Sequence, residues 1–72
     1  MTQAFETAVN KIKTQGREVL KGKGVYEMNL PYCGRGYKVA RYFPNHNQIQ
    51  IVSSDGFYDD WYNENSEYVP II

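Results

Sequence analysis

Cys33 and His46 are the two side chains whose types most directly provide covalent chemistry, because the 72-residue chain contains one cysteine and one histidine. A thiol beside an imidazole forms the nucleophile and base of many hydrolases. Here, however, Cys33 lies in a glycine-rich turn, and His46 stands between Asn45 and Asn47. Both settings are typical of ordinary surface positions. We therefore predict that the chain is not an enzyme and has no catalytic residues.

Metal and cofactor sites are also not indicated. One cysteine and one histidine do not provide the paired ligands of a zinc site. The acidic residues between positions 55 and 67 alternate with aromatic ones where a calcium loop needs Asp or Asn, and its central glycine is missing. The short glycine–cation–glycine runs at 22–24 and 34–36 lack the full pattern of a phosphate-binding loop. We expect neither a metal ion nor a cofactor.

Charge is divided sharply along the chain although the net charge is zero. Residues 1–41 contain all eight basic side chains and three acidic ones, which leaves a net charge of +5. Residues 42–72 contain five acidic side chains and no Lys or Arg, which gives −5. Such a division indicates an interaction surface of one sign, or two parts of one molecule that attract each other.

The acidic part is also rich in aromatic residues, and this combination favours protein binding. Aromatic side chains are typical anchors of protein interfaces, and carboxylates steer a module toward a basic partner. The predicted contact residues are Tyr58, Asp59, Asp60, Trp61, Tyr62, Glu64 and Glu67. Carboxylates on a small domain can also imitate the phosphates of a nucleic acid, as small phage and plasmid inhibitors do as a class. This comparison is an analogy.

Two alternatives to this interpretation remain open. The acidic residues could instead neutralise the basic helix within the same molecule, with Phe57 and Trp61 completing the core. The second alternative is a nucleic-acid-binding module, in which basic side chains contact phosphates and tyrosines stack on unpaired bases. Its binding residues would be Lys11, Arg17, Lys21, Lys23 and Arg35. Against it, the isoelectric point of about 6.5 is low for a basic module.

Length and composition favour one folded domain over residues 1–72. A chain of this size buries only about 60% of its unfolded surface, so oligomerisation could add stability. The 42% hydrophobic content is that of a globular protein. No apolar run approaches the roughly 18 residues of a membrane span, and the start of the chain has no apolar leader. We expect a cytoplasmic protein that does not bind membranes.

A helix is predicted from the apolar spacing in the first third of the chain. The apolar positions are Phe5, Ala8, Val9, Ile12, Val19 and Leu20, which share one face of an α-helix. Thr2 can cap its start, and Gly22 or Gly24 can end it. Gly16 costs about 1 kcal/mol inside a helix unless another backbone passes close. An early end near Thr14 is therefore the alternative.

Alternating patterns predict antiparallel strands after the helix, over residues 25–30, 37–43 and 48–53. Residues 57–62 fit a fourth strand or a helical turn, and residues 68–72 fit a short edge strand. The predicted fold is an α+β domain with one N-terminal amphipathic helix packed on a three- to four-stranded antiparallel meander. The predicted core consists of Phe5, Val9, Ile12, Leu20, Met28, Leu30, Val39, Ile49 and Ile51.

Overall fold

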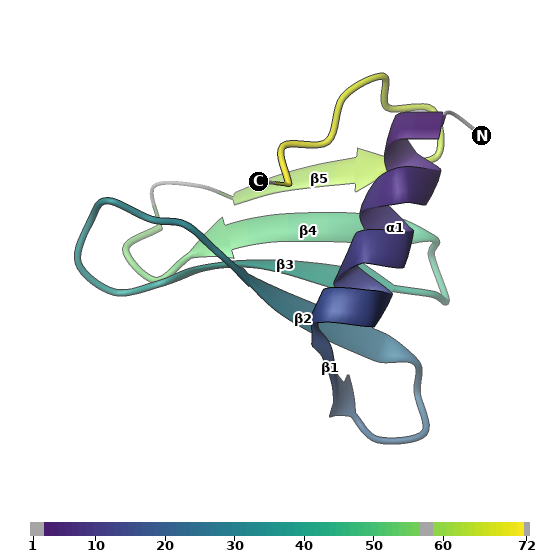
Figure 1. Ribbon diagram of the computed structural model, residues 1–72, viewed down its shortest axis with the longest axis horizontal. Coiled ribbons are helices and arrows are strands. Elements are labelled where there is room, and N and C mark those ends of the chain that lie inside the picture. Colours follow the sequence, from purple (N-terminus) through teal and green to yellow (C-terminus); the bar gives the residue numbers. More distant parts are fainter. Residues whose placement is uncertain (1–2, 57–58, 72) are drawn as a thin grey trace.

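One helix packs on one face of a five-stranded antiparallel sheet in the computed structural model, which describes residues 3–56 and 59–71 (Figure 1). The elements are α1 (Gln3–Gln15), β1 (Arg17–Leu20), β2 (Val25–Leu30), β3 (Lys38–Phe43), β4 (Gln48–Ser53) and β5 (Asp59–Asn63). The strand order is β1-β2-β3-β4-β5, so each strand pairs with its neighbour in sequence. The α+β meander is confirmed, but the predicted number of strands is wrong, because there are five.

Helix α1 is shorter than its apolar pattern predicts. Phe5, Ala8, Val9 and Ile12 are buried along one face, as expected from their spacing. The helix ends at Gln15, and the N–H of Gly16 donates the last helical hydrogen bond to the carbonyl of Ile12 at 2.9 Å. The next positions on the buried face, 15 and 16, are Gln and Gly, so no apolar side chain favours another turn. The proposed cap, Thr2, lies outside the described residues.

Gly16 allows the chain to turn directly from α1 into the sheet. A Cβ atom at this position would lie 2.3 Å from the carbonyl oxygen of Glu27 and 2.5 Å from that of Ile12. Both obstacles are backbone atoms, which cannot rotate away as a side chain can. The close approach of another backbone was the condition under which a glycine is favoured here, and the backbone of β2 meets it.

Strand β1 replaces the predicted second half of the helix. Arg17 and Glu18 pair with Glu27 and Tyr26 of β2, and all of β1 is exposed. The side chain of Leu20 is 53% exposed, so its assignment to the core was wrong. Residues 21–24 form the turn into β2, where Gly22 and Gly24 have φ angles of 78° and 73°. These glycines therefore shape a hairpin turn and do not end a helix.

The core lies between α1 and the sheet face that it covers. Across this face the register aligns Tyr26 with Tyr42, Tyr42 with Ile49, and Ile49 with Tyr62. The buried cluster consists of Phe5, Ala8, Val9, Ile12, Met28, Leu30, Ala40, Tyr42, Ile49, Ile51 and Val69. The predicted core is thus largely confirmed. Val39 is also buried, but its alternation with Ala40 places it on the other face of the sheet.

The C-terminal segment completes the core without forming the predicted edge strand. Val69 belongs to the buried cluster, and Ile71 packs against it. Residues 68–71 have no strand structure, and Ile72 lies outside the described residues. The predicted strand in the preceding segment is confirmed for Asp59–Asn63. Phe57 and Tyr58 lie outside the described residues. Across residues 3–56 and 59–71, no helix is both long and apolar enough to cross a membrane.

Candidate protein interface

The sheet has a second face, opposite α1, which we call the open face. Because side chains alternate along a strand, the residues that flank the core positions point to this face. The register aligns one row of them across all five strands. This row consists of Arg17, Glu27, Arg41, Gln50 and Trp61. The open face thus combines charged, amide and aromatic side chains.

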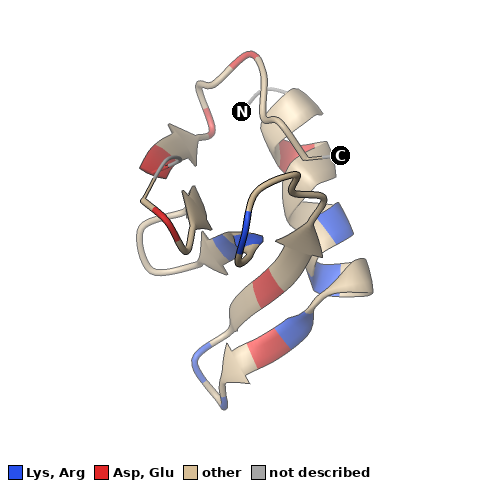
Figure 2. Cartoon of the chain, turned by 90° about the vertical axis from the view of Figure 1, so that its left-hand side faces the viewer, with Lys and Arg blue, Asp and Glu red and all other residues tan. Residues whose placement is uncertain are grey.

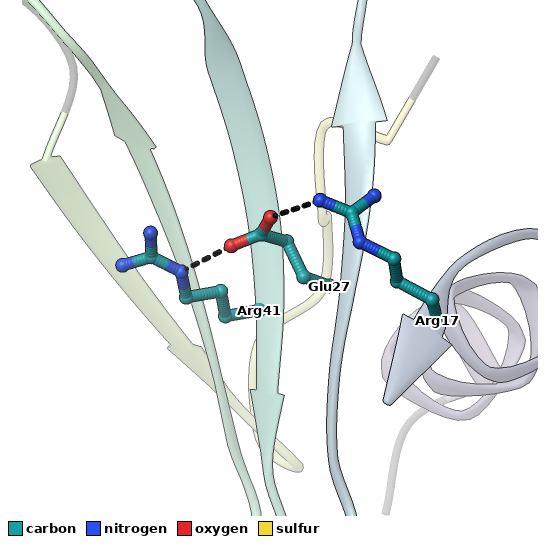
Figure 3. Close-up of polar contacts among 3 residues, drawn as sticks. All are labelled: Arg17, Glu27 and Arg41. Carbon is teal, nitrogen blue, oxygen red and sulfur yellow. Dashed lines mark hydrogen bonds and ion pairs between the residues drawn. The ribbon is translucent and has the colours of Figure 1, made fainter. Parts of the chain in front are cut away.

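Glu27 lies between two arginines of this row and holds both in place (Figure 3). The Nε of Arg41 donates to one carboxylate oxygen of Glu27 at 2.7 Å, and a terminal nitrogen of Arg17 donates to the other at 3.2 Å. The Glu27 side chain is only 12% exposed, whereas that of Arg17 is 65% exposed. A shielded carboxylate between two guanidinium groups fixes their positions and leaves this cluster with one net positive charge.

An apolar hollow lies beside this cluster on the open face. Val19, Leu20, Val25 and Phe43 line it together with Glu27 and Arg41, and its volume is about 280 Å³. A second hollow of about 300 Å³ adjoins it, sharing Leu20, Val25 and Phe43 and reaching Lys23 and His46. The two hollows are therefore lined mainly by apolar side chains, and the cationic side chains of Arg41 and Lys23 border them.

Trp61 extends the apolar surface from β3 to β5. Its ring lies against that of Phe43, with centroids 5.7 Å apart and planes inclined by 39°. This spacing is that of a favourable aromatic pair, which holds the indole in a defined position. The side chain nevertheless remains 53% exposed. A large, ordered and half-exposed aromatic side chain has the properties of an interface anchor.

The predicted contact residues do not share one face of the sheet. Asp59 and Trp61 lie on the open face. Asp60 and Tyr62 lie on the sheet face that α1 covers, where they pair with Ile51 and Ile49. Tyr62 packs against the core, so it is partly structural. Glu64 and Glu67 are exposed and follow β5 in sequence, and Tyr58 lies outside the described residues. The set is brought together at an edge of the sheet and not on a flat surface.

The outer side of β5 has backbone groups that point away from the sheet. The N–H of Asn63 donates to Oγ of Ser66 at 3.0 Å, and its carbonyl accepts from the N–H of Ser66 at 2.9 Å. The backbone of Asn63 therefore points away from β4. By the two-residue period of a strand, the backbone groups of Asp59 and Trp61 point the same way. Within the described residues, β5 is an edge strand with hydrogen-bonding capacity on its outer side.

The carboxylates at this edge are not neutralised by direct contact. Asp59 accepts a hydrogen bond from the amide of Gln50 at 3.2 Å, and Glu64 accepts one from Asn47 at 3.3 Å. Among the described residues, none of Asp59, Asp60, Glu64 and Glu67 forms an ion pair. We call Asp59, Asp60, Trp61, Glu64 and Glu67 the β5 surface. Its negative charge is available to a partner.

Most of the basic residues gather on the opposite side of the molecule. In Figure 2, Lys and Arg mark the helix and the lower strands, which also carry single acidic positions, whereas the region at the upper left, around β5 and the segment after it, carries Asp and Glu. Of the predicted nucleic-acid contacts, Arg17 lies on β1, Lys21 and Lys23 in the turn after it, and Lys11 on α1, which packs beside β1. Arg35 lies in the β2–β3 loop, at the other end of β2, roughly 20 Å away along that strand.

The two side chains first considered for covalent chemistry are also separated. Cys33 is exposed in the loop before β3, and His46 lies in the turn after β3. A strand of six residues spans roughly 20 Å. The thiol and the imidazole therefore lie at opposite ends of the sheet. Within residues 3–56 and 59–71, no group of three or more His, Cys, Asp or Glu side chains is placed to hold a metal ion.

Tyr62 makes the stability of the domain depend on pH in the alkaline range. Burial, then the Asp60 carboxylate and Tyr68, raise the pKa of Tyr62 above its ordinary value of 10.0. The unfolded chain therefore loses this proton at lower pH than the folded domain, so stability falls as pH rises above about 10. Replacing Tyr62 with Phe should remove this part of the alkaline loss in urea unfolding measured from pH 8 to 11. An unchanged alkaline slope in the variant would contradict this effect.

The comparisons with known proteins add no relative. No protein-family model, curated protein or solved structure matches this chain. The function must therefore be argued from the open face and from the β5 surface.

Proposed function

We propose that this domain is a non-catalytic protein-binding module that contacts a basic partner through the β5 surface. The observation that carries the proposal is Trp61, which is half-exposed, held against Phe43 and on the same face as Asp59, a carboxylate without an ion-pair partner. Burying an exposed tryptophan gives much of the affinity of many interfaces. The carboxylates of the β5 surface increase the rate of association with a basic surface and disfavour acidic partners.

A regulator of a nucleic-acid-handling protein is the kind of module we favour. Such a partner has a surface that binds phosphates, and carboxylates held on and just after an edge strand can occupy that surface. Asp59, Asp60, Glu64 and Glu67 lie on and just after one edge strand, with no basic residue among positions 59–67. The proposal for this partner class rests on charge complementarity and on the analogy with small inhibitors of mobile elements.

Affinity capture from a lysate of the native host tests this proposal. The tagged domain is expected to retain a protein partner after nuclease treatment, and the Asp59→Lys, Asp60→Lys double variant should lose most of it. A control, Gln3→Lys with Glu6→Lys, changes the charge by +3, against +4 in the β5 variant, on exposed positions of α1 and should retain capture. Unchanged capture by the β5 variant, or equal loss in both variants, would refute the assignment of the β5 surface. Circular dichroism confirms that both variants are folded.

Single-stranded nucleic acid is the second candidate ligand, favoured by a separate observation. Arg41 and Arg17 are held by Glu27 on the same face as Phe43 and Trp61, and Lys21 and Lys23 border that face. Aromatic rings beside fixed cations are typical of stacking platforms. This function predicts a gel shift with an oligonucleotide at about 50 mM salt that weakens as salt rises. The absence of a shift, together with capture that resists nuclease, would exclude this second candidate.

A further inference from the structure

We propose that a second copy of this chain is a partner of the β5 surface, joined head to tail with its β1 edge against β5. This inference rests on the proposed function, because it takes the β5 surface to be a protein-binding surface. It adds the identity of one partner. Three features carry it: the two end strands of the sheet, the opposite charges of their surroundings and the apolar side chains exposed at both.

The end strands offer matching backbone geometry. β1 and β5 each have one neighbour in the sheet, and all four residues of β1 are exposed. In an antiparallel meander of five strands, the first and fifth strands run in the same direction. A copy placed beside β5 with its helix on the same side therefore brings its β1 parallel to β5. The sheets of the two copies then continue across the joint, with the outward-pointing backbone groups of one edge facing those of the other.

The charges select this joint over a symmetric one. Residues 11–24, which surround β1, contain five basic side chains and one acidic one, whereas residues 59–67 contain four acidic and no basic ones. A two-fold joint would place β5 against β5, or β1 against β1, and would bring like charges together. Charged edges normally prevent pairing between identical edges. Here the same charges attract when the edges differ.

Exposed apolar side chains lie at both edges on the same face. Leu20 pairs with Val25 of β2 and so belongs to the open face, as Trp61 does at the other end of the sheet. Each of these two side chains is 53% exposed. In a head-to-tail joint that continues the row of the open face, Trp61 of one copy lies beside Arg17 of the following copy, with Leu20 three residues further along the same strand. The joint would therefore cover two exposed apolar side chains of the open face, Trp61 of one copy and Leu20 of the next.

Sedimentation velocity of the purified domain provides the test. At low salt, the wild-type protein should sediment faster as its concentration rises. This effect should disappear at about 1 M salt, where the Debye length is only about 3 Å and charge attraction is screened. Asp59→Lys with Asp60→Lys, and Lys21→Glu with Lys23→Glu, should each give a monomer, because each removes the net charge of one edge and with it the attraction across the joint. An equimolar mixture of the two variants should associate again, because one of its joints has the wild-type charges on both sides and the other has the substituted charges exchanged.

The outcomes separate this inference from the proposed function. A wild-type protein that stays monomeric at every concentration and salt would overturn the head-to-tail joint. So would a mixture that fails to associate, or association that only the β5 variant loses. If the monomeric protein still captures a lysate protein in a manner that depends on Asp59 and Asp60, the proposed function stands and only the self-association fails.

Discussion

Replacing Ile12 with Ala is expected to reduce the free energy of unfolding by about 2–5 kcal/mol, a large part of the stability of a domain this small. The Ile12 side chain is fully buried at the C-terminal end of α1 and belongs to the cluster that joins the helix to the sheet. Its truncation removes buried apolar surface and leaves a cavity that the surrounding strands cannot fill without moving.

Leu20→Ala is the control for this prediction. If α1 continued to Gly22, as the apolar spacing alone predicts, Leu20 would be buried on the same face as Ile12 and its truncation would be equally costly. In the structure Leu20 is exposed on β1, so the expected loss is well under half of that at Ile12. Urea unfolding followed by circular dichroism measures both. Equal losses at the two positions would contradict the end of the helix at Gln15.

Gly16→Ala is expected to destabilise the domain by at least about 1–3 kcal/mol, because the added Cβ would overlap two backbone carbonyl oxygens. The alternative gives the opposite sign. Inside a regular helix, alanine is more favourable than glycine by about 1 kcal/mol, so a helix that continued through position 16 would gain stability.

The matched control is Gly22→Ala, where no heavy atom lies within 4 Å of the added Cβ and only the positive φ of 78° opposes it. This change should cost about 1–2 kcal/mol from backbone conformation alone. A clash at position 16 should also disrupt the contact between α1 and β2, so the helical circular dichroism signal should melt at lower temperature in Gly16→Ala than in Gly22→Ala. A stabilised Gly16→Ala variant would refute the turn at this position.

The elements that the sequence predicted well are those whose pattern has one explanation. The alternation in β2, β3 and β4 places Met28, Ala40 and Ile51 on one face, and the structure aligns these residues across the three strands. The first turns of the helix follow equally from their spacing. These are local patterns, and burial on one face is enough to fix them.

The boundary between α1 and β1 could not be settled from apolar spacing, because Val19 and Leu20 continue the helical period after a gap. The informative residues were Gln15 and Gly16, which occupy the positions where the buried face of a longer helix needs apolar side chains. The close approach of Glu27 to Gly16 depends on the packing of β2 and is not encoded in neighbouring residues.

The candidate interface was predicted in composition but not in geometry. The acidic residues and Trp61 were identified from their types, whereas the division of β5 between two faces follows from its pairing with β4. The hollow beside Phe43 was missed, because its residues come from three strands. The sequence signal for this hollow is that Val25 and Phe43 are apolar although they alternate out of phase with the core positions of their strands.

The measurement that tests the central claim most directly is capture by the Trp61→Ala variant, compared with Tyr68→Ala. Both side chains are large, aromatic and exposed, but Trp61 lies on the open face and Tyr68 in the segment after β5. Affinity for the partner retained from the nuclease-treated lysate should fall by at least about 2 kcal/mol, roughly 30-fold, for Trp61→Ala. The Tyr68→Ala variant should bind nearly as the wild type does. Full binding by Trp61→Ala would show that the domain binds its partner elsewhere and would contradict this account.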